Sequence, residues 1–145
     1  MALSIYLYFN GRCREAFDHY KAVFEAEEIC RQLYSDGPPE MFGEEPADRI
    51  MHTSIRIGES ILMGSDRVSS CEEPIVSGDN FSVSYRPSSK EEADTLFPQL
   101  AAGGEITMPL QETFWGSYFG LCIDRFGIHW MFNYPLQSHS PENDN

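Results

Sequence analysis

The chain has 145 residues, of which 41% are hydrophobic and 13% are aromatic, so it can bury the core of one domain or of two small repeated modules. Its formal net charge of −13 at pH 7 argues against nucleic acid and against anionic membrane surfaces as partners. No run of the sequence approaches the roughly 20 apolar residues of a membrane span.

Two further features of the sequence favour a cytoplasmic location. The N-terminus lacks the basic start, apolar stretch and cleavage site that a secretory signal needs. The cysteines are widely spaced without a CxxC pair, which favours free thiols over disulfides or a cysteine metal site. They are Cys13, Cys30, Cys71 and Cys122.

The first half of the chain predicts the element order βαβββ. Leu3–Phe9 alternates apolar and polar residues, which is typical of a strand with one face in a core. Apolar residues at helical spacing then predict a helix over Arg12–Ala26. Three strands are expected after this helix, over Glu27–Tyr34, Arg49–Ile57 and Ser60–Ser65.

Acidic and polar residues gather in two places outside these elements. The segment Ser35–Asp48 holds five acidic residues and three prolines, and we expect a solvated loop there. The polar tail over residues 136–145 is expected to be disordered. Asp66, which ends the last strand of the first half, is expected to cap a turn.

The second half of the chain repeats the same order of elements. A strand is expected over Phe81–Tyr85. Ser89 stands three residues before Glu92, which is the spacing of a capping box, so a helix is expected to open there and to end at Gly103-Gly104. Three more strands are expected over Glu105–Leu110, Tyr118–Ile123 and Ile128–Asn133.

The two halves together predict an α+β fold built from a duplicated βαβββ unit. A shift of 77 residues lays Ala16 on Ala93 and Tyr20 on Phe97, so the apolar stripes of the two helices match. The strand before each helix fits less well, because its apolar parity slips by one residue. The expected boundaries are a first module over residues 1–66, a linker over 67–80, a second module over 81–135 and the tail over 136–145.

The last hairpin of the chain carries a specific resemblance. Asp124 and Gly127 stand where a tight turn needs them, between the strands Tyr118–Ile123 and Ile128–Asn133. A hairpin with this turn resembles the closing hairpin of the vicinal-oxygen-chelate superfamily, which contains glyoxalases, bleomycin-resistance proteins and extradiol dioxygenases.

Four passages in order resemble one branch of this superfamily, the PhnB-like proteins. They are Tyr6–Tyr20, Ile50–Asp66, Gly103–Trp115 and Phe119–Asn133. The resemblance implies tandem βαβββ modules that form a concave, cavity-enclosing mixed sheet with helices on the outer face, and it implies a homodimer. Proteins of this group often carry the label of a ubiquinone methyltransferase, yet the sequence has no Gly-rich strand–helix turn for a nucleoside cofactor.

The resemblance also implies where a metal would be held. Metal-dependent relatives use ligands on the first and last strand of each module, usually with a Glu four residues after the turn glycine. That position is Met131 in the second module and Leu62 in the first, and neither Leu3–Phe9 nor Phe81–Tyr85 contains His, Asp or Glu. Met is a soft ligand that suits Cu(I) better than Mg, Mn, Fe(II) or Zn. We therefore expect no metal ligands and no cofactor, with a divalent metal as the alternative.

Polar and aromatic side chains remain as candidates for a functional site. His52 shares a strand face with Ser54 and Arg56, and an inward imidazole would serve as a general base or as a donor to an anion. Glu112 precedes an aromatic pair and would serve as an acid or base if it were buried. His52 and Glu112 are therefore the candidate catalytic residues. The expected ligand-binding residues are Tyr6, Tyr8, His52, Trp115 and Trp130.

Two functions remain open on these residues. The first is a module that binds a small organic molecule in an aromatic cavity without the superfamily metal. The second is a lyase, isomerase or dioxygenase-type enzyme of the same superfamily that uses acid–base groups or an unusual metal site. The missing set of metal ligands favours the first, although a fold alone does not decide between chemistries.

Overall fold

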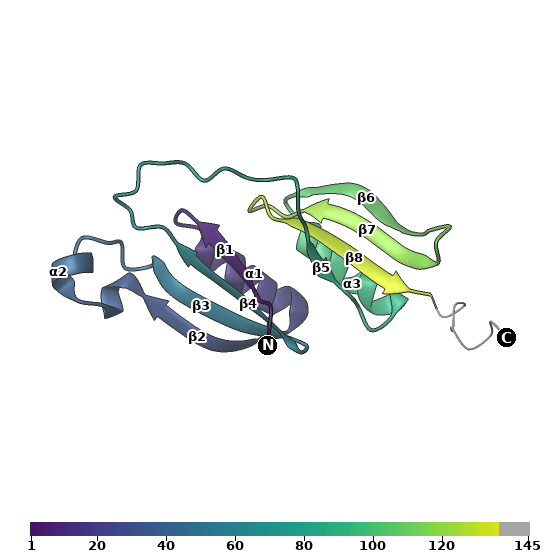
Figure 1. Ribbon diagram of the computed structural model, residues 1–145, viewed down its shortest axis with the longest axis horizontal. Helices are drawn as coiled ribbons and strands as arrows, with labels where there is room; N and C mark the ends of the chain where they lie inside the picture. Colours follow the sequence, from purple (N-terminus) through teal and green to yellow (C-terminus); the bar gives the residue numbers. More distant parts are fainter. Residues whose placement is uncertain (137–145) are drawn as a thin grey trace. The chain divides into compact units, whose positions relative to one another are not determined.

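The computed structural model describes residues 1–136 of the chain (Figure 1). The chain divides into two compact units, Met1–Val76 and Ser77–Asn145. The boundary between the units falls inside the segment 67–80, for which the sequence predicts a linker. The predicted disordered tail lies, apart from Leu136, outside the described residues.

The first unit is a four-stranded mixed sheet with a helix on one face (Figure 1). β1 (Ile5–Phe9) pairs in parallel with β4 (Ser60–Asp66), and β4 pairs on its other side with β3 (Ile50–Ile57). β2 (Glu27–Leu33) follows β3, so the strand order is β1-β4-β3-β2, with antiparallel pairing everywhere except between β1 and β4. The helix α1 spans Cys13–Phe24.

The second unit repeats this arrangement. Its strand order is β5-β8-β7-β6, with β5 and β8 parallel and the other pairs antiparallel. Its elements are β5 (Val83–Tyr85), α3 (Lys90–Ala101), β6 (Glu105–Glu112), β7 (Ser117–Ile123) and β8 (His129–Pro135). The prediction of an α+β fold with a duplicated βαβββ order is therefore confirmed.

The spacing between the repeats changes along the chain. α1 begins at residue 13 and α3 at residue 90, which gives the predicted shift of 77 residues. β1 begins at residue 5 and β5 at residue 83, a shift of 78, which accounts for the one-residue slip in apolar parity. β4 begins at residue 60 and β8 at residue 129, a shift of only 69. The shift is still 78 between the starts of β2 and β6, at residues 27 and 105, but it is 67 between the starts of β3 and β7, at residues 50 and 117. The first unit therefore carries an insertion between β2 and β3.

That insertion is the acidic segment. It contains a 3₁₀ turn over Tyr34–Asp36 and the short helix α2 (Pro39–Phe42), which lies beyond the end of the sheet (Figure 1). The buried ring of Tyr34 packs against the ring of Phe42, with centroids 5.0 Å apart. The segment is thus partly structured, whereas the sequence predicts only a solvated loop.

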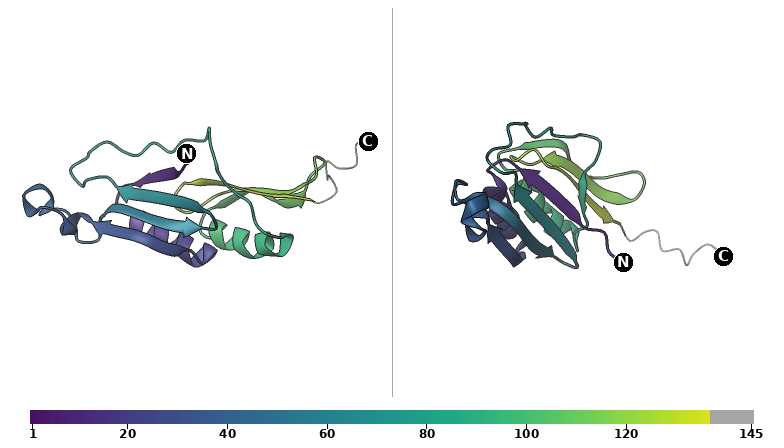
Figure 2. Two further views of the ribbon diagram at one scale, coloured as in Figure 1. Left: turned by 60° about the horizontal axis from the view of Figure 1, so that its bottom comes forward. Right: turned by 60° about the vertical axis from the view of Figure 1, so that its left-hand side comes forward.

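α1 packs against one face of the first sheet and forms the core of the first unit (Figure 2). Phe9 of β1 meets Phe17 of α1 edge to face, with ring centroids 6.2 Å apart. Gly64 of β4 leaves room for the same ring, because a Cβ at this position would lie 2.5 Å from Phe17. Leu3 is 99% exposed, so the predicted first strand is two residues too long at its start.

α3 covers one face of the second sheet in the same way (Figure 2). Phe132 of β8 packs against Phe97 of α3 and against Tyr85 of β5, with ring centroids 5.2 and 5.1 Å apart. Trp130 lies two residues before Phe132, on the same face of β8, and is buried. These aromatic rings form the core of the second unit.

The helix α3 begins and ends where the sequence predicts, although only the Ser89 half of the expected capping box is formed. Ser89 Oγ accepts the backbone N–H of Glu92 at 3.0 Å, and the Glu92 carboxylate accepts the backbone N–H of Ser88 at 2.7 Å. Burial acts to raise the pKa of Glu92, but its hydrogen bonds to Ser88 and Tyr85 outweigh burial and lower it. Gly103 follows the helix with φ of 78°, in the left-handed region that glycine favours.

The four cysteines are free, as the sequence predicts. Burial raises the pKa of the thiols of Cys13 and Cys122, so both are held as neutral, unreactive groups. Among residues 1–136, no helix combines the length and the apolar character needed to cross a membrane.

Candidate functional site

The face of the first sheet opposite α1 carries a set of polar and aromatic side chains. Leu7 and Leu62 fill the helix side and are each 4% exposed, so their neighbours along β1 and β4 point the other way. Strand pairing joins those neighbours into one surface, because Tyr6 lies beside Met63 and Met63 lies beside Ser54. We call this surface the distal face; it carries Tyr6, Tyr8, His52, Ser54, Arg56, Ile61, Met63 and Ser65.

Three of the predicted site residues meet on the distal face. Tyr6 Oη lies 3.1 Å from His52 Nδ1, which is hydrogen-bond distance. The two rings are stacked, with centroids 5.6 Å apart and an interplanar angle of 28°. The ring of Tyr8 lies 5.1 Å from that of Tyr6. The structure therefore brings His52, Tyr6 and Tyr8 into one cluster.

The distal face has little charge near this cluster. His52 and Tyr6 are half-buried, and Tyr8 is 59% exposed. Among the distal-face positions of β1, β3 and β4, Arg56 is the one charged residue, and it lies 3.8 Å from the carboxylate of Glu27 on β2. Aromatic rings with one imidazole can hold a flat organic molecule and give it one directed hydrogen bond.

The two tryptophans lie in the second unit, in different environments. Trp115 is 49% exposed and meets Phe114 and Phe119 edge to face, with ring centroids 5.0 and 5.6 Å apart. Trp130 is 2% exposed, and its indole N–H donates to Asp124 Oδ2 at 2.9 Å. Trp130 is therefore a core residue of the second unit, and no ligand contact by Trp130 is proposed. A ligand contact by Trp115 stays a prediction.

Glu112 is not buried, and its proposed acid–base role depended on burial. Its side chain is 62% exposed and pairs with Lys90 Nζ at 2.8 Å, a hydrogen bond that raises the pKa of Lys90. The Lys90 ammonium also lies 4.7 Å from the centre of the Tyr118 ring. A hydrogen bond from Tyr118 to Asp94 raises the pKa of Tyr118 to about 12. Glu112 thus belongs to a surface cluster of paired charges.

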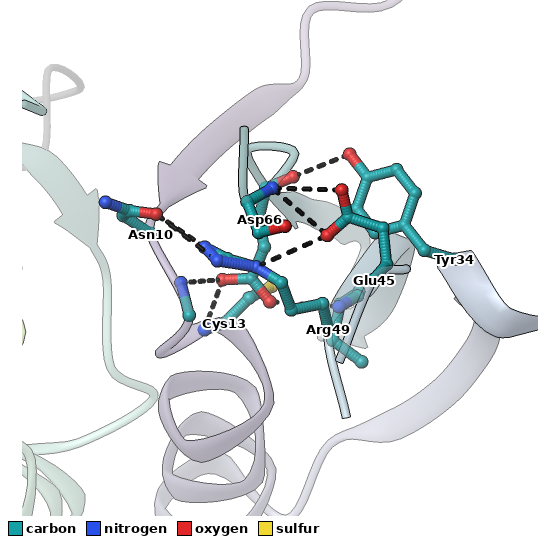
Figure 3. Close-up of polar contacts among 9 residues, drawn as sticks. Asn10, Cys13, Tyr34, Glu45, Arg49 and Asp66 are labelled. Carbon is teal, nitrogen blue, oxygen red and sulfur yellow. Dashed lines mark hydrogen bonds and ion pairs between the residues drawn. The ribbon is translucent and has the colours of Figure 1, made fainter. Parts of the chain in front are cut away.

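The sequence did not reveal the most buried polar cluster of the first unit, which centres on Asp66 (Figure 3). Asp66 is 1% exposed, and its Oδ1 accepts the backbone N–H groups of Gly11 and Cys13 at 2.6 and 3.1 Å. Its Oδ2 accepts the N–H of Ile50 at 2.9 Å, and its carbonyl accepts the Tyr34 hydroxyl at 2.9 Å. The carboxylate thus joins β4 to the start of α1 and of β3, whereas the sequence predicts only that Asp66 caps a turn.

A buried ion pair lies beside Asp66 (Figure 3). The guanidinium of Arg49 donates to Asn10 Oδ1, at 2.5 Å from the nearer nitrogen, and its Nε lies 4.0 Å from Glu45 Oε2. Both carboxylate oxygens of Glu45 accept the N–H of Ser69 at 3.0 Å. Only 8% of the Glu45 side chain is exposed, so this acid is anchored and not solvated. In the sequence, the one sign of this ion pair is that Arg49 directly follows the acidic segment Ser35–Asp48.

A hollow of about 290 Å³ opens next to Glu45, within the inserted segment. Its lining residues are Ser35, Gly37, Pro39, Phe42, Gly43, Glu45 and Ala47. Both oxygens of Glu45 accept the N–H of Ser69, and one of them lies near Arg49. This carboxylate is therefore not directed at a ligand in the hollow. The distal face is therefore the stronger candidate for a ligand site.

The residues at the superfamily metal positions do not fit a divalent metal. Met131 lies on the sheet side opposite α3, because Trp130 and Phe132 fill the helix side. Leu62 is buried on the helix side of its own sheet, so the counterpart of Met131 in the first unit is Met63 and not Leu62. Thioethers suit Cu(I) better than hard or borderline ions. Residues 1–136 also bring together no group of three or more His, Cys, Asp or Glu side chains that could hold a metal ion.

Solved structures of known proteins share this fold. Protein PA1353 from Pseudomonas aeruginosa superposes with a TM-score of 0.80 and 38% identity, covering 94% of this chain and 99% of that one. A putative 3-demethylubiquinone-9 3-methyltransferase, the PhnB protein from Bacillus cereus, gives a TM-score of 0.75 at 23% identity, over 92% and 99% of the chains. A glyoxalase/bleomycin resistance protein/dioxygenase family enzyme from Burkholderia phytofirmans PsJN gives 0.59 at 21% identity, over 90% and 97%. The fold is that of the glyoxalase/bleomycin-resistance superfamily.

Sequence comparison narrows this class to one family. Residues 1–132 match the family described as 3-demethylubiquinone-9 3-methyltransferase. The chain is also 33% identical over 142 residues to Protein YjdN from Escherichia coli K12, covering 92% of this chain and 95% of YjdN. The chain therefore belongs to this family, the PhnB-like branch of the superfamily.

Proposed function

We propose that the protein binds a small organic molecule on the distal face of its first unit, without the metal that superfamily relatives use. The observation that carries this proposal is the 3.1 Å contact between Tyr6 Oη and His52 Nδ1, which joins two stacked rings on the sheet face away from α1. Small-molecule sites commonly combine aromatic walls with a few placed polar groups. Tyr8 extends the aromatic surface, and we propose the exposed Trp115 as a separate ligand contact in the second unit.

A second candidate function is acid–base catalysis by an enzyme of the same superfamily. The same imidazole favours it, because a hydrogen bond to one ring nitrogen fixes the orientation of a catalytic histidine. The distal-face positions of β1, β3 and β4 contain no carboxylate, however, so His52 has no acidic partner there to complete a proton-transfer cycle. Ligand binding is therefore the function that we propose first.

Methyl transfer, which the family description names, has less support. Nucleoside cofactors commonly lie at a Gly-rich turn where the first N–H groups of a helix receive them. At α1 the carboxylate of Asp66 accepts the N–H groups of Gly11 and Cys13, and at α3 Ser89 accepts the N–H of Glu92. Neither helix start is arranged to receive a cofactor.

The test of ligand binding is a thermal-shift screen of small aromatic acids and ketones, followed by titration of each hit. We expect His52→Ala to abolish or weaken the shift while the melting temperature without ligand stays within a few degrees. His19→Ala is the matched control, because it removes an imidazole from α1 on the other side of the sheet. Equal shifts for wild type and His52→Ala would end the proposal for this site, and product formation with a hit would favour the enzyme instead.

The proposal of a metal-free site has its own test. Elemental analysis of the purified, dialysed protein should find no stoichiometric divalent metal, because Met63 and Met131 replace the oxygen or nitrogen ligands that such ions prefer. One tightly held Zn, Mn, Ni or Fe per chain would overturn this part of the proposal and would restore the alternative of a metal-dependent enzyme.

We also propose that the protein is a cytoplasmic homodimer. Free thiols suit a reducing compartment. Units of this size bury a limited core alone, and most soluble oligomers are symmetric pairs of one chain. Light scattering at micromolar concentration measures the mass directly, and a single species of 16.5 kDa would end the dimer proposal.

A further inference from the structure

The hydrogen bond between Tyr6 and His52 bears on the chemistry of the distal face, because the two nitrogens of an imidazole have different roles. In a neutral histidine one ring nitrogen carries a proton and donates, whereas the other has a lone pair and accepts. The imidazole of His52 forms a hydrogen bond with Tyr6, and this bond uses Nδ1. The state of Nδ1 therefore decides what Nε2 presents to a ligand.

The chemistry of the two partners decides the direction of this hydrogen bond. A phenol O–H is a good donor, but the phenol oxygen is a poor acceptor because the ring withdraws its lone pair. The lone-pair nitrogen of a neutral imidazole is a strong acceptor. At the 3.1 Å contact, this chemistry favours a hydrogen bond from the Tyr6 hydroxyl to Nδ1 of His52, with the imidazole proton on Nε2.

We propose that Tyr6 is a positioning residue that holds His52 as the Nε2–H tautomer, so that the distal face presents a hydrogen-bond donor beside two tyrosine rings. The ligand class that fits is a flat aromatic or conjugated molecule with an acceptor oxygen, such as an aryl ketone, an enol or an aryl carboxylate. Arg56, the one charged distal-face residue of β1, β3 and β4, is cationic, which agrees with a neutral or anionic ligand. This inference rests on the proposed function of the same site, and it makes Nε2 a donor and not a base.

The tautomer can be measured without any ligand. Nitrogen NMR of protein with labelled histidine, recorded at increasing pH until the spectrum no longer changes, distinguishes a protonated Nε2 from a protonated Nδ1. The chain has four histidines, and loss of one signal in His52→Gln assigns the resonance. We expect a single Nε2–H tautomer in the wild type and a mixture in Tyr6→Phe. Tyr8→Phe, which removes a hydroxyl from the next tyrosine of the same strand face, should keep the wild-type tautomer.

The ligand class needs a second measurement with defined probes. Benzoate and acetophenone carry an acceptor oxygen on an aromatic ring, whereas benzylamine carries only donors. We expect the two acceptors to bind in preference to benzylamine, and Tyr6→Phe to weaken them by about tenfold, the value of one hydrogen bond. Tyr134→Phe, which removes a hydroxyl in the second unit, is the control for the loss of a phenol.

The two measurements separate the inference from the proposed function. A protonated Nδ1 in the wild type, or the same tautomer composition in Tyr6→Phe, would overturn the inference even if the probes bind through His52. Preference for benzylamine would overturn the ligand class. If no probe binds while His52 is held as Nε2–H and is released in Tyr6→Phe, the positioning role of Tyr6 stands and the proposed function fails.

Discussion

The indole N–H of Trp130 donates a 2.9 Å hydrogen bond to Oδ2 of Asp124, and both residues are at most 3% exposed. The other carboxylate oxygen accepts the backbone N–H groups of Phe126 and Ile128 in the turn between β7 and β8. One buried carboxylate thus ties the turn to the largest ring of the second core. This turn carries the sequence signature of the hairpin, and the hydrogen bond explains why an acid begins it.

Replacement of Asp124 by Ala should destabilise the second unit by about 3 kcal/mol, because a buried indole N–H and two turn amides lose their acceptor. Asp79→Ala is the control, because it removes an exposed carboxylate from the same unit. Chemical denaturation, followed by tryptophan fluorescence, measures the free energy of unfolding of both variants. A loss below about 1 kcal/mol for Asp124→Ala, the scale of one ordinary hydrogen bond, would show that water replaces the carboxylate.

Gly64→Ala should destabilise the first unit by about 1–3 kcal/mol through overpacking. A Cβ at residue 64 would lie 2.5 and 2.8 Å from two carbons of Phe17, and the fully buried ring has little room to move. Gly78→Ala is the matched control, because its nearest neighbours would lie at an ordinary 3.4 Å. Chemical denaturation measures the free energy of unfolding of the two variants. Equal stability would mean that Phe17 shifts without strain.

Glu92 should make the stability of the second unit depend on pH. Burial acts to raise its pKa, yet the hydrogen bonds from Ser88 and Tyr85 lower it below the ordinary value of 4.5. A group whose pKa is lower in the folded state contributes stability above its unfolded pKa and loses that contribution as pH falls through its folded pKa. The contribution is therefore complete at pH 7 and disappears in the acid range below about 4.5.

The measurement is urea denaturation of wild type and Glu92→Gln at pH 7 and at successively lower pH. We expect the variant to be less stable at pH 7 and the difference to shrink as the wild-type carboxyl becomes protonated. Glu91→Gln, in the same first turn of α3, removes a charge without removing the bonds to Ser88 and Tyr85. A difference between wild type and Glu92→Gln that is constant with pH would contradict the linkage.

Truncation of the two tryptophans to Ala should change the stability of the protein by very different amounts. Trp130→Ala should cost about 3–5 kcal/mol, as for a large core side chain, because Trp130 is 2% exposed. Trp115→Ala should change stability by less than about 1 kcal/mol, since surface substitutions have small effects and Trp115 is 49% exposed. Acrylamide should quench the fluorescence of Trp130→Phe far more than that of Trp115→Phe. Strong protection of Trp115 in the native protein would reveal that a partner covers it, as the homodimer proposal allows.

Periodicity and turn chemistry in the sequence were sufficient for most of the fold. The helix repeat at 77 residues, the cap at Ser89 and the turn at Gly127 all depend on local patterns, and all are present. Leu3 was assigned to the first strand because alternation does not show where a strand loses its partner. The buried pair of Glu45 and Arg49 depends on the path of the inserted segment through space, which no local pattern specifies.

The arrangement of the residues of the candidate site could be predicted in part. Alternation placed Tyr6, Tyr8 and His52 on sheet faces correctly, and strand pairing then made them one cluster. The position four residues after the turn glycine does not mark equivalent sheet faces in the two units. β3 and β4 are joined by two residues, whereas the turn between β7 and β8 is longer. In the first unit this position is therefore Leu62, on the helix side, and the residue on the opposite side is Met63.

The position of β4 between β1 and β3 has a consequence for how this unit is made on the ribosome. Tyr6 and His52 lie on strands that are not neighbours, so their hydrogen bond spans a strand that is translated after both of them. A nascent or truncated chain that ends before Ser60 contains both rings but lacks the strand that brings them together. The imidazole of His52 therefore reaches its position beside Tyr6 only after β4 has left the ribosome and paired with β1 and β3. A chain truncated before β4 would lack the binding surface that we propose.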